Sequence, residues 1–310
     1  MATEPDTVVV LDFGSQYAQL IARRVRELHV YSELLPFDTP WPEIARRRPA
    51  AVILSGGPSS VYDTDAPRPD PSLWAGGVPV LGICYGLQLM ARELGGAVVP
   101  AKKREYGPAS LTITAEDGLF RGLEREQPVW MSHGDSILQP PPGFHSTAQT
   151  ASTPFAALVD PARRLYGIQF HPEVVHTPHG RDVLRNFVLG IAGARPTWTP
   201  ASFIDQTVAD IRARVDSHAR DGADGRVICA LSGGVDSAVA ATLVHRAVGD
   251  RLTCIYVDHG LMRKKESELL RATFEHNLGM QLVMVDARER FLRRLEGVTD
   301  PERKRRIIGD

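Results

Sequence analysis

One cysteine stands between two glycines at a spacing typical of an exposed nucleophile. Residues 82–86 read Gly-Ile-Cys-Tyr-Gly, between an apolar run, 78–83, and a run of helical periodicity, 85–94. Glycine two residues before and two after a nucleophile allows a tight, strained strand-to-helix turn. The N-terminus of the helix that follows favours a thiolate and offers N–H groups to an oxyanion. The pattern predicts that Cys84 is a catalytic nucleophile; the alternative is a small apolar residue at a strand end.

A histidine and a carboxylate follow another apolar segment, where residues 170–173 read Phe-His-Pro-Glu. His171 and Glu173 are two residues apart, so in extended chain their side chains point to the same face. The carboxylate can then fix the imidazole tautomer and stabilise the imidazolium, so that the ring acts as a base for a thiol. A metal site made of His171, His176 and His179 is a weaker interpretation, because their spacing matches no zinc pattern.

These segments resemble the class I, triad-type glutamine amidotransferases. The resemblance is carried by residues 81–88 (Leu-Gly-Ile-Cys-Tyr-Gly-Leu-Gln) and by residues 170–173. It implies hydrolysis of the side-chain amide of glutamine with release of ammonia. It also implies a catalytic triad in which Cys84 is the nucleophile, His171 the general acid and base, and Glu173 the orienting carboxylate.

The same resemblance implies roles for residues around the triad. Residues 55–58 (Ser-Gly-Gly-Pro) match the oxyanion loop of the family, so the N–H groups of Gly57 and Tyr85 are expected to hold the oxyanion. His133 lies among the residues expected to bind the substrate and is interpreted as a loop histidine rather than a second base. Glutamine is expected to be bound by Gly56, Gln88, Ser132, Gly134 and Asp135.

A second loop of small residues, 232–237 (Ser-Gly-Gly-Val-Asp-Ser), lies between the apolar run Val227–Leu231 and a helix expected from Ala238. Its backbone N–H groups and hydroxyls can approach a phosphate, and a helix N-terminus favours the anion. Asp236 would be repelled by phosphate and is better suited to Mg²⁺. The loop lacks the Gly-Lys-Ser/Thr of a Walker A motif. An ordinary tight turn is the alternative.

This loop is similar to the PP-loop of ATP pyrophosphatases, which cleave ATP between the α- and β-phosphates. The resemblance implies Mg²⁺ with ATP, held by Asp236, and no organic prosthetic group. Residues 256–265 are expected at the same edge of the sheet. Cys229 and Cys254 lie in apolar runs and are interpreted as core residues. ATP is expected to be bound by Ser232, Gly233, Gly234, Val235, Asp236, Ser237, Val257 and Asp258.

The elements around the two sites predict two α/β domains. In residues 1–194, apolar strands alternate with helices, which predicts an open, mostly parallel sheet covered on both faces. The first of these helices is expected to be capped by Ser15. Short alternating segments in residues 98–170 predict added antiparallel strands. The proline-bearing segment 195–202 predicts a linker. Residues 203–310 predict an incomplete α/β domain of the PP-loop type, with strands at 227–231, 253–257 and 281–285.

An amidotransferase domain followed by this loop is similar to the arrangement in glutamine-hydrolysing GMP synthetases. That resemblance implies the reaction of XMP, ATP, glutamine and water to GMP, AMP, diphosphate and glutamate. Members of that family continue past the position of Asp310. We therefore expect the rest of the second sheet, most of the XMP pocket and a C-terminal homodimerisation domain to lie outside this chain, which alone is expected to be at most a weak glutaminase.

Composition excludes several other classes. The 310 residues carry 36 Lys+Arg and 37 Asp+Glu, a formal charge of −1, so there is no basic field for nucleic acid. No apolar run approaches the ~18 residues of a membrane span. Three cysteines favour a reducing cytoplasm. The basic run 303–306 is interpreted as a solvated helix face.

Two other interpretations stay open. In one, the chain is a stand-alone glutaminase or an ammonia-supplying subunit, which the phosphate loop opposes. In the other, it is a PP-loop tRNA sulfurtransferase, which would need catalytic cysteines near the loop and a basic face. Binding of ATP separates the first from a synthetase, while the net charge and the apolar setting of Cys229 and Cys254 oppose the second.

Overall fold

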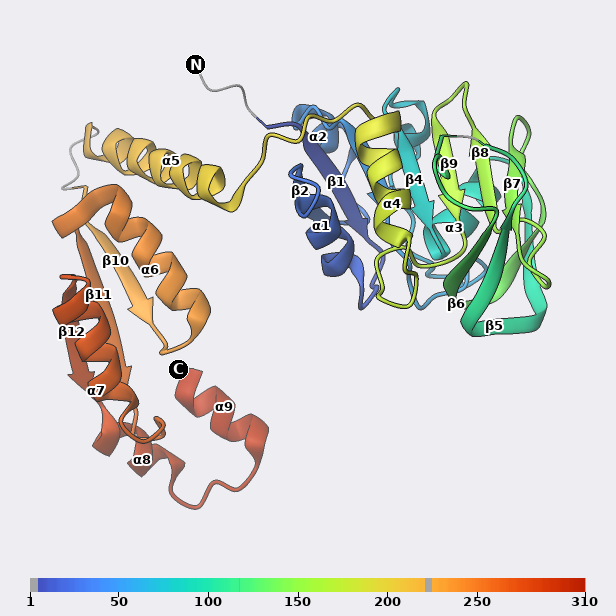
Figure 1. Cartoon of the computed structure of the whole chain (residues 1–310). Helices are drawn as coiled ribbons and strands as arrows, with labels where there is room; N and C mark the ends of the chain where they lie inside the picture. The colour runs from blue at the N-terminus through green and yellow to red at the C-terminus, as the bar shows by residue number, and fades with distance from the viewer. Residues whose placement is uncertain (1–4, 117, 221–224, 310) are drawn as a thin grey trace. The chain divides into compact units, whose positions relative to one another are not determined.

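The computed structural model describes residues 5–116, 118–220 and 225–309. It divides into two compact units, Met1–Thr199 and Pro200–Asp310, called unit 1 and unit 2 below. The ribbon of each unit is shown in Figure 1. In the described residues, no helix is both long enough and apolar enough to cross a membrane.

Unit 1 is built on one sheet that is parallel in one half and antiparallel in the other. The strand order is β2-β1-β3-β4-β9-β8-β7-β5-β6. The pairs from β2 to β9 are parallel and the pairs from β9 to β6 are antiparallel. The prediction of a mostly parallel sheet with added antiparallel strands is confirmed. The strands are β1 (Thr7–Asp12), β2 (Tyr31–Pro36), β3 (Ala51–Leu54), β4 (Val80–Ile83), β5 (Ala97–Ile113), β6 (Glu126–Gln139), β7 (His145–Gln149), β8 (Ala157–Asp160) and β9 (Leu165–Ile168).

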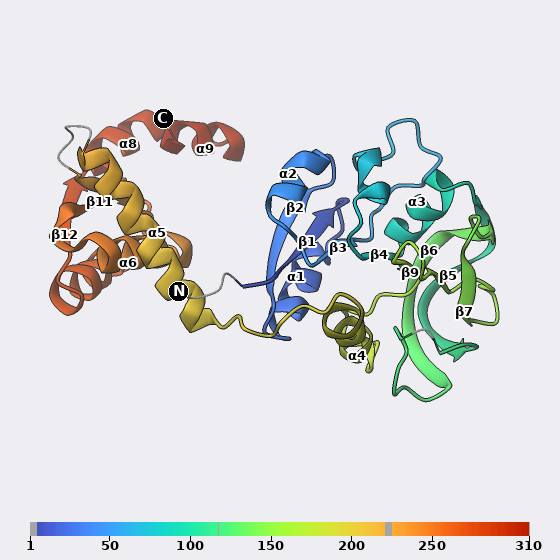
Figure 2. The ribbon, with the colours of Figure 1, turned by 90° about the horizontal axis from the view of Figure 1, so that it is seen from above.

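Helices cover both faces of the parallel half, as Figure 2 shows from above. On one face lie α1 (Ala18–Arg26) and α4 (Gly180–Arg185), which continues as the π-helical turn η2 (Asn186–Ile191). On the other lie α2 (Trp41–Arg46) and α3 (Tyr85–Glu93). A 3₁₀ turn, η1 (Pro71–Ala75), lies between β3 and β4. Continuous apolar strands require this double cover, because both of their faces are withdrawn from water.

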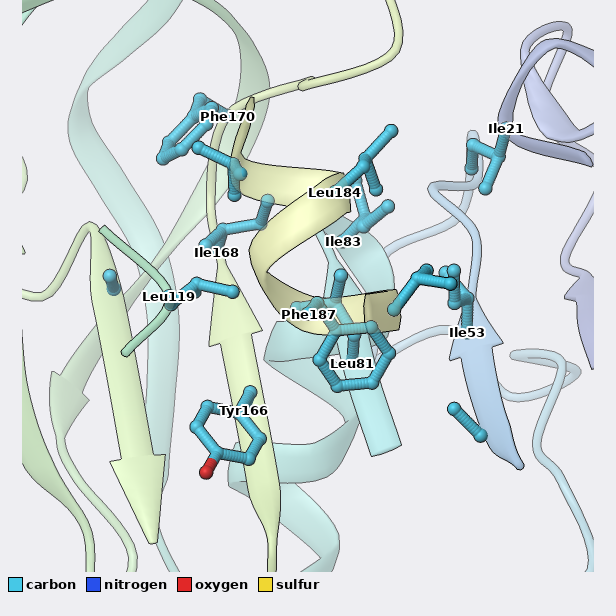
Figure 3. Packing of buried hydrophobic residues seen from close by; sticks show 14 of the residues in the cluster. Ile21, Ile53, Leu81, Ile83, Leu119, Tyr166, Ile168, Phe170, Leu184 and Phe187 are labelled. Carbon is cyan, nitrogen blue, oxygen red and sulfur yellow. The ribbon is translucent and has the colours of Figure 1, made fainter. Parts of the chain in front are cut away.

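The core on the α1 and α4 face is formed by aliphatic and aromatic side chains from strands and helices. Leu184 and Phe187 pack against Leu81 and Ile83 of β4, and all four are fully buried (Figure 3). β4 leads directly into residue 84 and β9 into the segment that carries His171. The same packing therefore holds both strands that end at the predicted catalytic residues.

The first helix of each unit starts at a residue other than the one predicted. Ser15 is not the cap of α1, whose N-cap residue is Tyr17; the Ser15 hydroxyl instead accepts a hydrogen bond from the Tyr17 N–H (3.1 Å) in a turn before the helix. Pro200, placed in the predicted linker 195–202, is the first residue of α5 (Pro200–Arg220). Proline suits that position, because its missing N–H would have no helical partner.

Unit 2 contains a three-stranded parallel sheet of order β10-β11-β12. One face packs against α5, α6 and the α7–η4 helix through a core that includes Leu252 and Tyr256. The other face exposes apolar side chains, including Ile228 (74 % exposed) and Val283 (47 %). The elements are β10 (Val227–Leu231), α6 (Val235–Val248), η3 (Gly249–Arg251), β11 (Leu252–Asp258), α7 (Glu266–Arg271), η4 (Ala272–Asn277), β12 (Gln281–Asp286), α8 (Arg288–Leu295) and α9 (Pro301–Gly309).

The position of β10 at the edge of this sheet corrects one expectation about the cysteines. Cys254 of β11 is buried in the core, as predicted. Cys229, its register partner on β10, is only partly buried, so it is not a full core residue. The basic residues 303–306 are exposed on α9, which confirms the interpretation of that run as a solvated helix face.

Candidate active site

Cys84 lies at a strained turn between β4 and α3. Its backbone has φ +53° and ψ −105°, in a region that non-glycine residues rarely adopt, and it immediately precedes the first residue of α3. The turn closes tightly. A Cβ on Gly82 would lie 2.6 Å from the carbonyl carbon of Gly86, and a Cβ on Gly86 would lie 2.7 Å from the Cβ of Leu54. Both glycines are therefore required by close backbone approach. This geometry is the nucleophile elbow expected from the sequence.

His171 and Glu173 form a buried pair beside Cys84. The Nδ1 atom of His171 lies 2.7 Å from Oε1 of Glu173, whose side chain is fully buried. The Nε group of Arg24, on α1, donates to the backbone carbonyl of Glu173 (3.0 Å) and helps to fix this segment. Burial disfavours the charged ring, but the interactions with Cys84 and Glu173 outweigh it and raise the pKa of His171 to about 10. The pair can therefore hold a proton close to the sulfur.

The glycine loop after β3 lies against both side chains predicted to be catalytic, Cys84 and His171. A Cβ placed on Gly56 would meet His171 Cε1 at 3.0 Å and Cys84 Cβ at 3.7 Å. A Cβ on Gly57 would meet the Tyr85 ring at 3.4 Å. Tyr85 is the first residue of α3, where an N–H has no acceptor within the helix. The loop thus lies against the first residue of α3, as an oxyanion site built from the Gly57 and Tyr85 N–H groups would require.

A cavity of about 480 Å³ opens beside Cys84 and contains the residues expected to bind glutamine, except Gly56. The thiol of Cys84 lies 3.4 Å from the carbonyl oxygen of Ser132. Gln88 Nε2 donates to the carbonyl of Asp135 (2.9 Å) and lies 3.3 Å from Gln169 Oε1. The cavity is lined by Gly57, Pro58, Ser59, Ser60, Cys84, Tyr85, Gln88, Pro100, Ala101, Arg104, Tyr106, Ser132, His133, Gly134 and Asp135.

The expected glutamine segment differs from the prediction in one respect. Residues 132–135 belong to the strand β6, and His133 is a buried strand residue rather than a loop residue. The cavity also contains Arg104, Tyr106 and Ser60, which sequence reasoning did not single out. Ser60 donates to the Asp135 carboxylate (2.6 Å). Arg104 and Tyr106 are two residues apart on β5, but this alternation resembles that of any half-exposed strand and gives no signal of a site.

The loop after β10 forms a compact turn at the N-terminus of α6. The hydroxyls of Ser232 and Ser237 lie 3.1 Å apart, and the Ser237 hydroxyl donates to the Gly234 carbonyl (3.0 Å). Gly233 has φ +83°, a conformation that favours glycine. α6 begins at Val235 rather than at Ala238 as predicted, so part of the loop forms the first helical turn.

A second cavity, of about 730 Å³, adjoins this loop. Of the residues predicted to bind ATP, it includes Gly233, Gly234 and Ser237, and it also includes three consecutive basic residues, 263–265. Ser232, Val235, Asp236, Val257 and Asp258 lie outside its lining. Cationic side chains beside a small-residue turn and a helix N-terminus are suited to the phosphates of a nucleotide.

The carboxylates near the phosphate loop bear on Mg²⁺. Asp236 is exposed in the first turn of α6, and Asp258 ends β11, where its carboxylate accepts from the Gly260 N–H (2.9 Å). In the described part of the chain, no cluster of three or more His, Cys, Asp or Glu side chains could hold a metal ion. The zinc interpretation for His171, His176 and His179 therefore has no structural support. Mg²⁺ needs no such cluster, since substrate phosphates and water supply most of its ligands.

Comparison with protein families gives two matches along the chain. The family described as glutamine amidotransferase class-I matches residues 9–191, and the family described as NAD synthase matches residues 204–304. The first match contains Cys84, His171 and Glu173, and the second contains the phosphate loop after β10.

Curated proteins with similar sequences are named GMP synthase [glutamine-hydrolyzing]. The protein of Parafrankia sp. (strain EAN1pec) is 59% identical over 304 residues, which are 98% of this chain and 56% of that protein. The protein of Heliobacterium modesticaldum is 55% identical over 310 residues, which are 100% of this chain and 59% of that protein. The chain thus spans somewhat more than half the length of these relatives.

Two solved structures each resemble this one over 62% of its length. A putative GMP synthase subunit from Thermoplasma acidophilum superposes with a TM-score of 0.53 at 30% identity, covering 62% of this chain and 96% of that one. A glutamine amidotransferase from Thermotoga maritima, at 18% identity and a TM-score of 0.50, covers 62% of this chain and 100% of that one and supports the fold alone. By the match over residues 9–191 and the geometry around Cys84, this chain belongs to the class-I glutamine amidotransferase family.

Proposed function

We propose that this chain hydrolyses glutamine at Cys84 and supplies the ammonia to an ATP-dependent amination of XMP to GMP. The observation that carries the first step is the elbow that places the Cys84 thiol beside the buried His171–Glu173 pair. The second step rests on the identity of 59% and 55% to two GMP synthases across nearly the whole chain. The NAD synthase family match over unit 2 supports a nucleotide-using domain there.

In the glutaminase step, the sulfur of Cys84 attacks the side-chain amide carbon of glutamine. The oxyanion that forms is held by the N–H groups of Gly57 and Tyr85. His171 gives its proton to the leaving ammonia, and a thioester results. Water, deprotonated by His171, then hydrolyses the thioester to glutamate and frees the sulfur. Glu173 holds the ring in place through both steps.

The amino-acid end of glutamine is proposed to bind at the part of the cavity wall that carries Asp135 and Arg104. The Asp135 carboxylate suits the substrate ammonium, and Arg104, which lines the same cavity, suits the substrate carboxylate. Gln88 and the backbone of residues 132–134 complete this wall, and Gly56 lies at the sulfur itself. Two opposite charges at one end of a pocket select a free amino acid over a peptide side chain.

For the synthetase step, we propose that residues 203–310 form the N-terminal part of an ATP pyrophosphatase domain, joined by residues 195–202 to an amidotransferase domain, 1–194. ATP would bind at the phosphate loop, with Mg²⁺ held by Asp236 and the nucleotide phosphates. The metal would neutralise phosphate charge as the bond between the α- and β-phosphates breaks. XMP adenylated at its 2-oxo group would then exchange AMP for ammonia. Such a metabolic role is consistent with a cytoplasmic location.

The test is to incubate the chain with glutamine and measure glutamate and ammonia, with asparagine as the matched control substrate. Release from glutamine, lost in Cys84→Ala, supports the proposal, whereas no release in the wild type contradicts it. Equilibrium binding of Mg-ATP to the same chain separates a nucleotide-using enzyme from a stand-alone glutaminase. A sulfurtransferase is disfavoured, because burial and the nearby Cys229 raise the pKa of Cys254 to about 11 and keep it a thiol at neutral pH.

A further inference from the structure

A largely buried carboxylate outside the triad, 12% exposed, gathers four donors next to His133, which lines the cavity. Glu105, on β5, accepts hydrogen bonds from three hydroxyls of the 150–153 turn: Thr150 (3.0 Å), Thr153 (2.5 Å) and Ser152. Its Oε2 also lies 3.1 Å from Nε2 of His133, its direct partner across the β5–β6 pair. Burial raises the pKa of Glu105, but these hydrogen bonds outweigh it and hold the pKa below the usual value.

His133 connects this carboxylate to the cavity wall. Its side chain is 1 % exposed, and its Nδ1 lies 2.8 Å from the carbonyl oxygen of Asp135. The same carbonyl accepts from Gln88 Nε2. Both oxygens that face the ring, the carbonyl of Asp135 and the carboxylate of Glu105, can accept a hydrogen bond from it. A continuous set of contacts thus runs from Glu105 through His133 and Asp135 to Gln88.

We infer that Glu105 is a positioning residue for substrate recognition, acting through His133 to hold residues 132–135 and Gln88 in the geometry that binds the amino-acid end of glutamine. The inference deepens the proposed glutaminase function and rests on it. The triad is held by other elements, namely the turn between β4 and α3 and the segment after β9. Loss of Glu105 should therefore weaken substrate binding far more than it changes the reactivity of Cys84.

The experiment uses two reagents that modify the sulfur of the full chain. The diazoketone analogue of glutamine, 6-diazo-5-oxo-L-norleucine, must occupy the cavity before it alkylates Cys84, so its inactivation kinetics give a binding constant and a maximal rate. Iodoacetamide needs no such binding and reports the reactivity of Cys84 alone, once Cys84→Ala has been used to subtract labelling of the other thiols. Steady-state KM and kcat for glutamine are measured alongside.

In Glu105→Ala, the binding constant for the diazoketone and KM for glutamine should rise by about tenfold or more, because a charged hydrogen-bond network is lost. The maximal inactivation rate and the iodoacetamide rate should change by less than about threefold. Glu105→Gln should restore most of the binding, because an amide can accept from the hydroxyls and donate to a His133 ring that keeps Nδ1–H. Ser152→Ala removes one exposed donor and should weaken binding only about twofold.

The matched control is Glu126→Ala. Glu126 lies on the same β5–β6 pair and accepts from the Ser110 and Thr112 hydroxyls (both 3.1 Å), but it lies outside the cavity lining. Glu126→Ala should leave the binding constant for the diazoketone and KM for glutamine unchanged. In a double-mutant cycle, Glu105→Ala with His133→Ala should cost little more than either change alone, since both act through one set of contacts.

Unchanged binding in Glu105→Ala, or a fall in the iodoacetamide rate as large as the loss of binding, would overturn the inference. Tryptophan fluorescence checks that each variant is folded. Should Glu105→Ala not fold, Glu105→Gln and Ser152→Ala are compared with the Glu126 control, and equal binding in Ser152→Ala and wild type contradicts the inference. A wild-type chain that the diazoketone does not inactivate saturably refutes the proposed function itself.

Discussion

Oε1 of Glu173 lies 2.7 Å from Nδ1 of His171, only two residues earlier in the chain. This short connection leaves Nε2 of the ring for Cys84, which interacts with His171 and raises its pKa. Within the described residues, Oε2 of Glu173 is buried and has no hydrogen-bond partner. The hydrogen bonding of the Glu173 carboxylate is thus directed to the His171 ring alone, so the pair is sensitive to any change at position 173.

Replacing the nucleophile tests the centre of the site. Cys84→Ala should reduce glutamine hydrolysis by ~10³-fold or more, because loss of a nucleophile leaves only the oxyanion site and substrate binding. Glutamate release by the purified chain is the measurement. Activity comparable to wild type would mean that another group performs the attack and that the triad is wrongly assigned.

Replacing the orienting carboxylate should have a smaller effect. Glu173→Gln keeps the shape of the side chain but removes its charge, so turnover should fall by on the order of 10²-fold, less than in Cys84→Ala. The pKa of His171 should also fall, because one of the two groups that raise it becomes neutral. A pH titration of the His171 ring by NMR checks this, and an unchanged titration would show that Cys84 alone sustains the shift.

The residues proposed for the triad could be singled out from the sequence because each of them has a local signature. Gly82 and Gly86 are required by backbone approach within one turn, and the spacing of His171 and Glu173 follows from extended chain. The phosphate loop was found for the same reason. The start of α6 was misplaced, because Val235 gives no capping signal and the helix begins inside the loop.

Features that depend on chain segments far apart could not be predicted. Glu105 meets His133 and the 150–153 turn only through strand register, and nothing local distinguishes it from other strand carboxylates. His133 was interpreted as a loop residue, yet it lies in β6, where strand pairing overrides the turn preference of the neighbouring Gly134 and Asp135. The partial exposure of Cys229 likewise follows from the position of β10 at the edge of its sheet, which the apolar neighbours of Cys229 in sequence do not reveal.

The close approach at the elbow predicts a stability cost for one added methyl group. In Gly86→Ala, the new Cβ would lie 2.7 Å from the Cβ of Leu54. The free energy of unfolding of unit 1 should therefore fall by about 1–3 kcal/mol, and glutamine turnover should fall as well.

Gly190→Ala is the control, since no atom lies within 4 Å of its Cβ. It should stabilise unit 1 by about 0.5–1 kcal/mol. All four tryptophans lie in unit 1, so their fluorescence during urea unfolding measures both changes. Equal stability of the two variants would contradict the tight turn.

The Glu105 carboxylate predicts a pH dependence of stability. Because the folded state lowers the pKa of Glu105, its stabilising contribution is present above the ordinary glutamate value of 4.5 and is lost as pH falls through the lowered folded value. Glu105→Gln removes this titration, so the free energy of unfolding of unit 1 should depend less steeply on pH below pH 4.5. Urea unfolding from pH 6 to 3, followed by tryptophan fluorescence, measures the slope. Glu126→Gln is the control, and an equal slope in wild type and Glu105→Gln would contradict the prediction.

The phosphate loop predicts a selective loss of ATP binding when a methyl group is added to Gly233. Its φ of +83° disfavours any side chain, and its Cβ would lie 2.7 Å from Oε1 of Glu266, which lines the same cavity. The Glu266 side chain can move aside, but relief of the φ strain moves the loop N–H groups away from the phosphates, so Mg-ATP affinity should fall by about tenfold or more. Gly249→Ala is the matched control in unit 2, because it also carries a positive φ (+59°) but has no atom within 4 Å and lies outside the cavity lining. It should lose a comparable ~1 kcal/mol of stability while binding Mg-ATP like the wild type. Calorimetric titration of each variant provides the measurement, and equal affinities in Gly233→Ala and wild type would mean that this loop does not hold the nucleotide.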